Sequence, residues 1–311
     1  MICDLRFVIS AQRPRTRVCI KFAAMTLHQR TGQIDGHPTT YFDSASGYYG
    51  LRQPAIVLVP SMFLMARSYA ATCRELMREG FRVVALEMPG TGRSTQTSAD
   101  WSFDDYAYWL ACAIDEIGLV EPALIGHSVS AGVVLTCAAR HPSRVGSIVV
   151  CDATGCRSGA DRLLRIVPGR LMDAIDELAF DVRTAPDALF NATHHPRDCM
   201  HQFRLTKLCQ LPIAQRVHRP TLIAWGARDR TMPLRFAIEL DRAMSDASLY
   251  VSQEGSHDWI VDRPDEFARA VRRFVVDKVR APLEASQIRY LGVPVSETSH
   301  HSDYLSTGTA G

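Results

Sequence analysis

Short apolar runs alternate with longer stretches of helical periodicity along most of the chain. The run Ala55–Val59 predicts a buried strand, and the apolar spacing over residues 65–78, which stops before Gly80, predicts the helix after it. The same pattern predicts strands at 81–86, 123–125, 145–150, 221–225 and 248–251, and helices at 103–117, 130–140, 234–244 and 266–279. Strands that alternate with helices form βαβ units. The sequence therefore predicts an α/β fold with a mostly parallel central sheet flanked by helices.

The alternation lapses over residues 158–211, where only helical periodicity is found. Pro168, Pro186 and Pro196 predict breaks between helices there, because proline lacks an N–H and clashes with the preceding turn. This segment is predicted to be a helical cap inserted into the α/β core. The predicted division of the chain is an N-terminal extension (1–37), a core in two parts (38–157 and 212–280), the cap (158–211) and a partly disordered C-terminal tail (281–311).

The composition is that of an ordinary globular protein. The 311 residues are 47% hydrophobic and 22% charged, and 35 basic against 33 acidic residues give a net charge of +2. This balance argues against a nucleic-acid-binding protein, which usually carries a strong basic excess. The chain has no apolar run of about 18 residues, so no membrane span is predicted.

The cysteines and the N-terminal segment indicate where the protein resides. The nine cysteines are scattered, and none forms a C-x-x-C pair. Arginines split the N-terminal apolar patches, whereas a secretory signal has its charges before one unbroken apolar stretch. We therefore expect no disulfide framework, a non-secretory extension and a cytoplasmic location. Met25 is an alternative to Met1 as the translation start.

The strongest chemical signal is I-G-H-S-V-S-A-G over residues 125–132. It carries the chain from a predicted strand straight into a predicted helix, with Ser128 at the apex of a tight turn. Such a turn needs small neighbours, and it lifts the serine hydroxyl clear of the sheet. The backbone N–H of Val129 would then lie at a helix N-terminus, where it can bind a developing oxyanion.

This segment resembles the nucleophile elbow of the α/β-hydrolase fold superfamily, which reads G-x-S-x-G. Gly126 and Ser128 match, whereas Ser130 stands in the place of the second glycine. Serine is small, so the turn can still close. The resemblance implies that Ser128 is a nucleophile, and a serine nucleophile needs a base because a free hydroxyl reacts poorly at neutral pH.

Two later segments resemble the loops that carry the base and the acid in this family. Residues 254–267 resemble the histidine loop G-H-x-x-x-x-E-x-P-x-x-F, with one extra residue before His257. Residues 225–233 resemble W-G-x-x-D-x-x-x-P and place Asp229 after a strand. The resemblance implies a catalytic triad of Ser128, Asp229 and His257, in the chain order that this fold uses.

The oxyanion hole is predicted from the loop after the first core strand. The family usually has His-Gly at this point, whereas this chain has Pro60 and Ser61. Proline has no N–H to donate. Aligned in this way, Met62 supplies one backbone N–H and Val129 supplies the other.

Other polar residues have alternative explanations. Asp152, after the strand at 145–150, is a competing acid, because some hydrolases of this fold place the acid there, or else it caps the entry to the cap. The loop 88–94 resembles the family's D-x-P-G-x-G-x-S loop and lacks the G-K-[ST] of a phosphate loop, so a structural role is favoured. A histidine-rich stretch in the predicted cap matches no zinc spacing, so neither a metal nor a cofactor is predicted; its residues are His194, His195, Asp198, Cys199 and His201.

The resemblance implies a cofactor-free, esterase-like serine hydrolase (EC 3.1) that cleaves a carboxylic ester or related acyl bond through an acyl-enzyme. Bulky apolar residues of the cap favour a small hydrophobic acyl or aromatic substrate; these are Phe180, Leu189, Phe190 and Phe203. One alternative is a C–C bond hydrolase of aromatic ring-fission products. Another is a slow-turnover ligand sensor that acts through a protein partner, because G-H-S-V-S-A resembles the elbow of the strigolactone and karrikin receptors and their bacterial stress-signalling relatives. A homo-oligomer is left open.

Overall fold

The computed structural model describes residues 26–45, 53–97, 100–155, 178–278 and 290–291. Within these ranges, all strands join one sheet in the order β1-β2-β4-β3-β5-β6-β7-β8-β9. The strands are β1 (His28–Ile34), β2 (His37–Asp43), β3 (Ala55–Val59), β4 (Arg82–Leu86), β5 (Ala123–His127), β6 (Ser147–Cys151), β7 (Thr221–Gly226), β8 (Ala247–Ser252) and β9 (Tyr290–Leu291). β2 pairs antiparallel with β1 and β4, and the remaining pairs are parallel. The predicted α/β fold with a mostly parallel sheet is confirmed.

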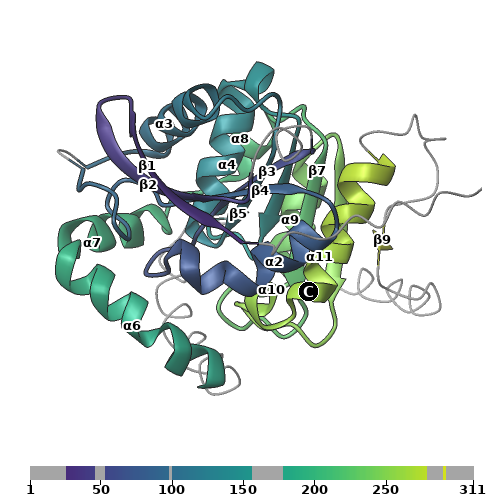
Figure 1. Cartoon of the computed structure of the whole chain (residues 1–311). Coiled ribbons are helices and arrows are strands. Elements are labelled where there is room, and N and C mark those ends of the chain that lie inside the picture. Colours follow the sequence, from purple (N-terminus) through teal and green to yellow (C-terminus); the bar gives the residue numbers. More distant parts are fainter. Residues whose placement is uncertain (1–25, 46–52, 98–99, 156–177, 279–289, 292–311) are drawn as a thin grey trace, which may run out of the picture.

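Helical layers cover both faces of the sheet (Figure 1). The helices are η1 (Ala66–Tyr69), α2 (Ala70–Arg78), α3 (Phe103–Glu116), α4 (Val129–Arg140), η2 (Pro142–Arg144), α6 (Leu178–His194), α7 (Pro196–Leu205), α8 (Leu211–Ala214), α9 (Arg235–Ala243), α10 (Trp259–Asp262) and α11 (Pro264–Arg272). A π-helical segment, Arg273–Lys278, continues α11. None of the helices in these ranges combines the length and apolarity needed to cross a membrane.

The central strands are apolar throughout because both of their faces are buried. In β3, Val57 and Val59 belong to the core on the side of α3, α4 and α9. Ile56 and Leu58 belong to the core on the side of α2, α10 and α11. Side chains of successive strand residues point to opposite faces, so one short run contributes to both cores. This burial fixes the strand ends, and therefore the loops that carry the predicted site residues.

The sheet begins before residue 38, where the sequence analysis placed the start of the core. β1 is an edge strand, and most of its side chains are exposed. Its residues are therefore polar, and they show no apolar run that a hydrophobicity pattern could detect. Residues 1–25 of the predicted N-terminal extension lie outside the described ranges.

The predicted break at Pro186 is wrong, whereas the break at Pro196 is confirmed. α6 runs through Pro186 without ending. A proline removes one helical hydrogen bond, and tertiary contacts of the next turns can offset that cost. Pro196 opens α7, at the first helical position, where an N–H is not needed.

The boundaries of the cap and of the tail stay predictions. Residues 156–177, which include Pro168, lie outside the described ranges, as does the tail apart from β9. The described cap helices, α6 and α7, stand apart from the two helical layers (Figure 1). They contact the loops that follow β3 and β4, for example through Asn191 to Phe63 and His195 to Gly92.

Candidate active site

Ser128 lies at the turn between β5 and α4 in a conformation that few residues other than glycine adopt. Its φ is 58° and its ψ is −117°. The turn also brings two backbones together, because a Cβ at Gly126 would lie 2.5 Å from the carbonyl oxygen of Ser130 and 2.8 Å from the Cα of Ala131. The strand-to-helix turn predicted from the motif is therefore present, with the serine at its apex.

Ser130 explains why the departure from the family motif is tolerated. Its buried Oγ accepts the backbone N–H of His127 at 2.9 Å. The hydroxyl proton faces the carbonyl oxygens of Val59, at 2.8 Å, and His127, at 2.9 Å. The side chain thus ties the turn to the end of β3, and the small hydroxymethyl group fits where the family has glycine.

The structure brings together the three residues predicted to form the triad, at the carboxyl ends of β5, β7 and β8. The His257 Nε2 lies 3.1 Å from the Ser128 Oγ, and its Nδ1 lies 2.9 Å from the Asp229 Oδ2. The Asp229 Oδ1 accepts the backbone N–H of Met232 at 2.6 Å, which holds the carboxylate. The side chains of His257 and Asp229 are 6% and 0% exposed. This arrangement can transfer a proton from a serine hydroxyl to an imidazole that an acid orients.

The competing acid, Asp152, lies behind this chain of hydrogen bonds. Its Oδ1 accepts the backbone N–H of Gly226 at 2.9 Å, and its Oδ2 accepts the indole N–H of Trp259 at 2.8 Å. Burial, and then the charge and hydrogen bond of Asp229, raise the pKa of Asp152 well above its usual range. Burial and the neighbouring Asp229 therefore favour the neutral form of Asp152. The geometry favours Asp229 as the acid that faces the imidazole.

One backbone N–H of the loop after β3, which is predicted to form the oxyanion hole, donates to a neighbouring phenol. The backbone N–H of Ser61 donates to the Tyr69 Oη at 3.0 Å, so it is not available to an oxyanion. Within the described part of the chain, the backbone N–H groups of Met62 and Val129 donate to no protein acceptor. Val129 is the first residue of α4, where the helix dipole favours negative charge. These are the two residues predicted as oxyanion donors.

The family model of the α/β-hydrolase fold matches residues 54–193, and the solved structures of similar shape include hydrolases of this fold. The chain has the α/β-hydrolase fold, and these matches support its place in the α/β-hydrolase superfamily. The resemblance seen in the sequence motifs is therefore confirmed at the level of the family.

Individual relatives of this α/β hydrolase are distant. A protein of Mycobacterium phage D29 named as a non-heme haloperoxidase is 24% identical over 71% of this chain and 87% of its own. The 2-hydroxymuconate semialdehyde hydrolase of Pseudomonas putida is 27% identical over 63% of this chain and 77% of its own. The solved structure of a meta-cleavage product hydrolase of Pseudomonas fluorescens IP01 gives a TM-score of 0.67 at 20% identity, covering 80% of this chain and 98% of that one. These likenesses support a hydrolase without defining its substrate.

A buried cluster of side chains that the sequence motifs did not indicate, Tyr69, His127 and Asp258, lies beside the three residues predicted to form the triad. The Tyr69 Oη is 2.7 Å from the His127 Nδ1, and the His127 Nε2 is 3.0 Å from the carbonyl oxygen of His257. Ligand-type atoms of His127, His257 and Asp258 lie within 4.8 Å of one another. The rings of both histidines already bond protein atoms, so a metal ion would have to displace these bonds. The only sequence signal for this group was the position of His127 next to Ser128.

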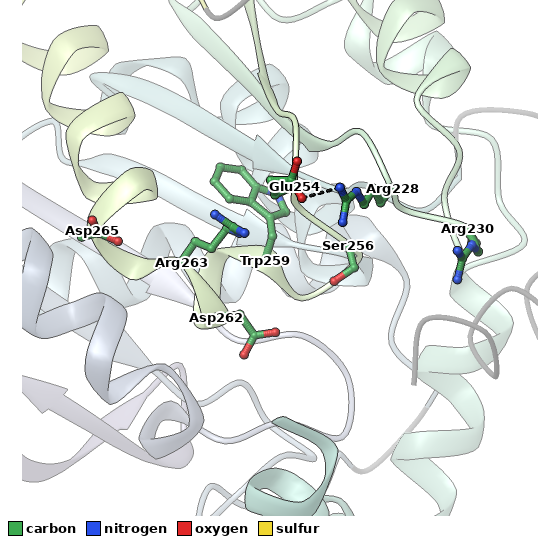
Figure 2. Close-up of a pocket in the computed structure, with 8 residues that line it drawn as sticks. All are labelled: Arg228, Arg230, Glu254, Ser256, Trp259, Asp262, Arg263 and Asp265. Atoms are coloured by element: carbon green, nitrogen blue, oxygen red, sulfur yellow. Dashed lines mark ion pairs between the residues drawn. The ribbon is translucent and has the colours of Figure 1, made fainter. Parts of the chain in front are cut away.

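A pocket of about 790 Å³ opens beside the loops that carry Asp229 and His257 (Figure 2). Its lining consists of Arg228, Arg230, Glu254, Ser256, Trp259, Asp262, Arg263 and Asp265. An ion pair between Arg228 and Glu254 joins the loop of Asp229 to the loop of His257 (Figure 2). The lining includes no triad residue and is mostly charged, so this pocket is poorly suited to an apolar acyl group.

The bulky residues of the predicted cap that the structure describes are exposed or contact other residues of the cap. Leu189 is 65% exposed, and the ring of Phe190 stacks on His194 at 4.0 Å. The Phe203 ring lies under the ammonium group of Lys207, and the side chain of Phe180 lies outside the description. The described part of the cap therefore gives little support to these apolar residues as a substrate-binding surface.

Polar side chains instead seat the cap on the core. Asn191 is buried and donates its amide N–H to the Phe63 carbonyl at 2.9 Å, while its Oδ1 accepts the Gly92 N–H at 2.8 Å. His195 and His201 face the backbone carbonyls of Gly92 and Trp101. The histidines of this stretch thus bond separate backbone groups and do not converge on one point.

The loop after β4 is built around Glu87. Its buried carboxyl group accepts the backbone N–H of Ala66 at 3.2 Å and that of Arg93 at 2.9 Å. Burial raises the pKa of Glu87 above its ordinary value. These contacts hold the loop to the start of η1, in line with the structural role predicted for it.

Proposed function

We propose that this α/β hydrolase is a serine hydrolase that cleaves a carboxylic ester or related acyl bond of a small, largely hydrophobic substrate. The observation that carries the proposal is the hydrogen-bonded chain from the Ser128 Oγ through the His257 imidazole to the Asp229 carboxylate. The strained backbone at Ser128 supports it, because residues in such conformations cluster at active sites.

The proposed reaction has two half-reactions. The Ser128 Oγ attacks the carbonyl carbon while His257 Nε2 takes the hydroxyl proton, and Asp229 stabilises the imidazolium that forms. The N–H groups of Met62 and Val129 bind the oxyanion of the tetrahedral intermediate. The imidazolium then gives its proton to the leaving group, which departs and leaves an acyl-serine. Water, deprotonated by His257, attacks the acyl group, and Ser128 recovers its proton as the acid is released.

A C–C bond hydrolase is the second candidate. The similarity to the 2-hydroxymuconate semialdehyde hydrolase and to the meta-cleavage product hydrolase favours it, although these proteins are less than 30% identical to this chain. The same three side chains would serve a carbon leaving group. A ligand sensor with slow turnover stays a prediction from the motif. We also propose a cytoplasmic location, which is supported by the free thiols of the six described cysteines.

A fluorophosphonate probe tests the proposed nucleophile. The folded wild type should be labelled, and Ser128→Ala and His257→Ala should lose the label. Ser143→Ala, which changes an exposed serine of η2, is the matched control and should keep it. A folded wild type that the probe leaves unlabelled would contradict the serine hydrolase. Nitrophenyl esters of several chain lengths, compared with a coloured dienoate, then separate acyl from C–C cleavage.

A further inference from the structure

A buried chain of hydrogen bonds connects the loop after β3 with the backbone of the base. The Ser61 N–H donates to the Tyr69 Oη at 3.0 Å, and that oxygen lies 2.7 Å from the His127 Nδ1. The His127 Nε2 lies 3.0 Å from the carbonyl oxygen of His257. All four residues are buried, with Tyr69 at 0% and His127 at 1% exposure. These hydrogen bonds therefore connect the proposed oxyanion loop to the proposed base, His257, through His127, which precedes the proposed nucleophile.

The partners at its two ends fix the direction of every bond. A carbonyl oxygen can only accept, so the His127 Nε2 must carry a proton to bond His257. A neutral imidazole has one N–H, so its Nδ1 is then an acceptor. Tyr69 already accepts from Ser61, and it donates its single proton to that Nδ1. Of the two neutral tautomers of His127, only the Nε2–H form satisfies all three bonds.

Two other observations agree with this arrangement. Burial raises the pKa of Tyr69 well above its usual range, so the phenol keeps the proton that it donates. The Asp258 Oδ1 lies 3.6 Å from the His127 Nε2. A carboxyl oxygen on this side of the ring favours a proton on Nε2 over one on Nδ1.

We propose that His127 is a positioning residue, which as its Nε2–H tautomer holds the backbone of His257 and, through Tyr69, the loop of Ser61 in place around the nucleophile. This proposal rests on the proposed serine hydrolase. It assigns a role to the variable position of the elbow motif, and that role depends on having both an acceptor and a donor on one rigid ring. Asparagine carries a polar atom where histidine has Nδ1, and glutamine carries one where histidine has Nε2.

Two substitutions distinguish the bond of His127 to the His257 carbonyl from its bond to Tyr69. His127→Gln can still donate to the His257 carbonyl but offers Tyr69 no acceptor, so we expect its kcat for a nitrophenyl ester to fall by only about threefold. His127→Asn keeps an acceptor for Tyr69 but loses the bond to His257, and we expect kcat to fall about tenfold or more with KM little changed. His28→Gln, an exposed histidine on β1, is the matched control. Equal kcat values for the Asn and Gln variants, both folded by circular dichroism, would overturn the proposal.

The tautomer itself can be observed without any turnover. In protein labelled with ¹⁵N-histidine, long-range ¹H–¹⁵N correlations show which ring nitrogen carries the proton, and the signal that disappears in His127→Gln identifies the residue. We expect a proton on Nε2 and a bare Nδ1. A proton on Nδ1 overturns the relay even if the probe labels Ser128. Failure of the probe with the expected tautomer overturns the hydrolase proposal, and the role in catalysis with it, but not the hydrogen-bond chain.

Discussion

Asp152 and Asp229 share a hydrogen bond, but only Asp229 bonds the His257 imidazole. Asp152 instead receives N–H groups from the ends of two other segments, Gly226 of β7 and Trp259 of α10. Its place after β6 made it a competing acid in the sequence. In the structure its carboxyl group instead joins the loops that carry the predicted acid and the predicted base.

We therefore expect the two carboxylates to differ in substitution experiments. Asp229→Asn should lower kcat by about 10³ to 10⁴, because the amide no longer fixes the productive imidazole tautomer. Asp152→Asn should lower kcat by about tenfold or less, because the His257–Asp229 bond stays. Steady-state hydrolysis of a nitrophenyl ester measures both. Equal losses in the two variants would contradict the assignment of Asp229.

The raised pKa of Asp152 also predicts a pH dependence of stability. In the folded state Asp152 holds its proton above pH 4, whereas in the unfolded chain it loses it at about pH 3.9. The native state thus binds more protons in this range, so the contribution of Asp152 to the free energy of unfolding decreases as pH rises from about 4 toward the folded pKa. Asp152→Asn lacks this dependence.

Denaturant unfolding of the wild type and of Asp152→Asn over a series of pH values measures the difference. The free energy of unfolding of the wild type should exceed that of the variant by less as the pH increases. An advantage that grows with pH would mean that Asp152 is ionised in the folded protein. Asp104→Asn, at an exposed position of α3, is a suitable control because its carboxyl group is 61% exposed.

Much of the architecture could be predicted because it depends on local patterns. Runs such as Ala55–Val59 are apolar throughout since both faces of the strand are buried. The polar edge strand β1 has no such constraint, so it left no signal. Pro186 misled the prediction because a helix interior can accept the loss of one hydrogen bond when the tertiary contacts of its later turns hold it.

The site was predictable to the extent that one residue and its neighbours determine a turn. Ser128 and Gly126 carry their own geometric requirement, which a motif records. The bonds of His127 to Tyr69 and His257 join residues 58 and 130 positions apart, and neither partner has a special neighbour sequence. Such contacts follow from the packing of the whole core, so sequence patterns did not reveal them.

The hydroxyl of Ser130 should contribute measurably to stability. Ser130→Ala leaves the buried His127 N–H and Val59 carbonyl without this partner, and we expect a loss of about 1–3 kcal/mol in the free energy of unfolding. Ser130→Gly restores the family's glycine but should lose at least as much, because it adds backbone entropy to the unfolded chain. Urea denaturation measures both losses. A glycine variant as stable as the wild type would show that the hydroxyl only fills space.

Asn191 should couple the cap to the proposed oxyanion loop. Its amide bonds the Phe63 carbonyl and the Gly92 N–H, and Phe63 has a φ of 67°, a conformation that its surroundings must maintain. Asn191→Leu removes both bonds from a buried site, so we expect kcat to fall about tenfold and the free energy of unfolding to fall by about 1–3 kcal/mol.

Asn191→Asp keeps the acceptor for Gly92 and repels the Phe63 carbonyl, so it tests the contact to the loop of Phe63 alone. Ester hydrolysis beside thermal unfolding compares the two, with Thr193→Ala on the exposed side of α6 as the control. A kcat unchanged in Asn191→Asp would mean that the cap and the loop act independently.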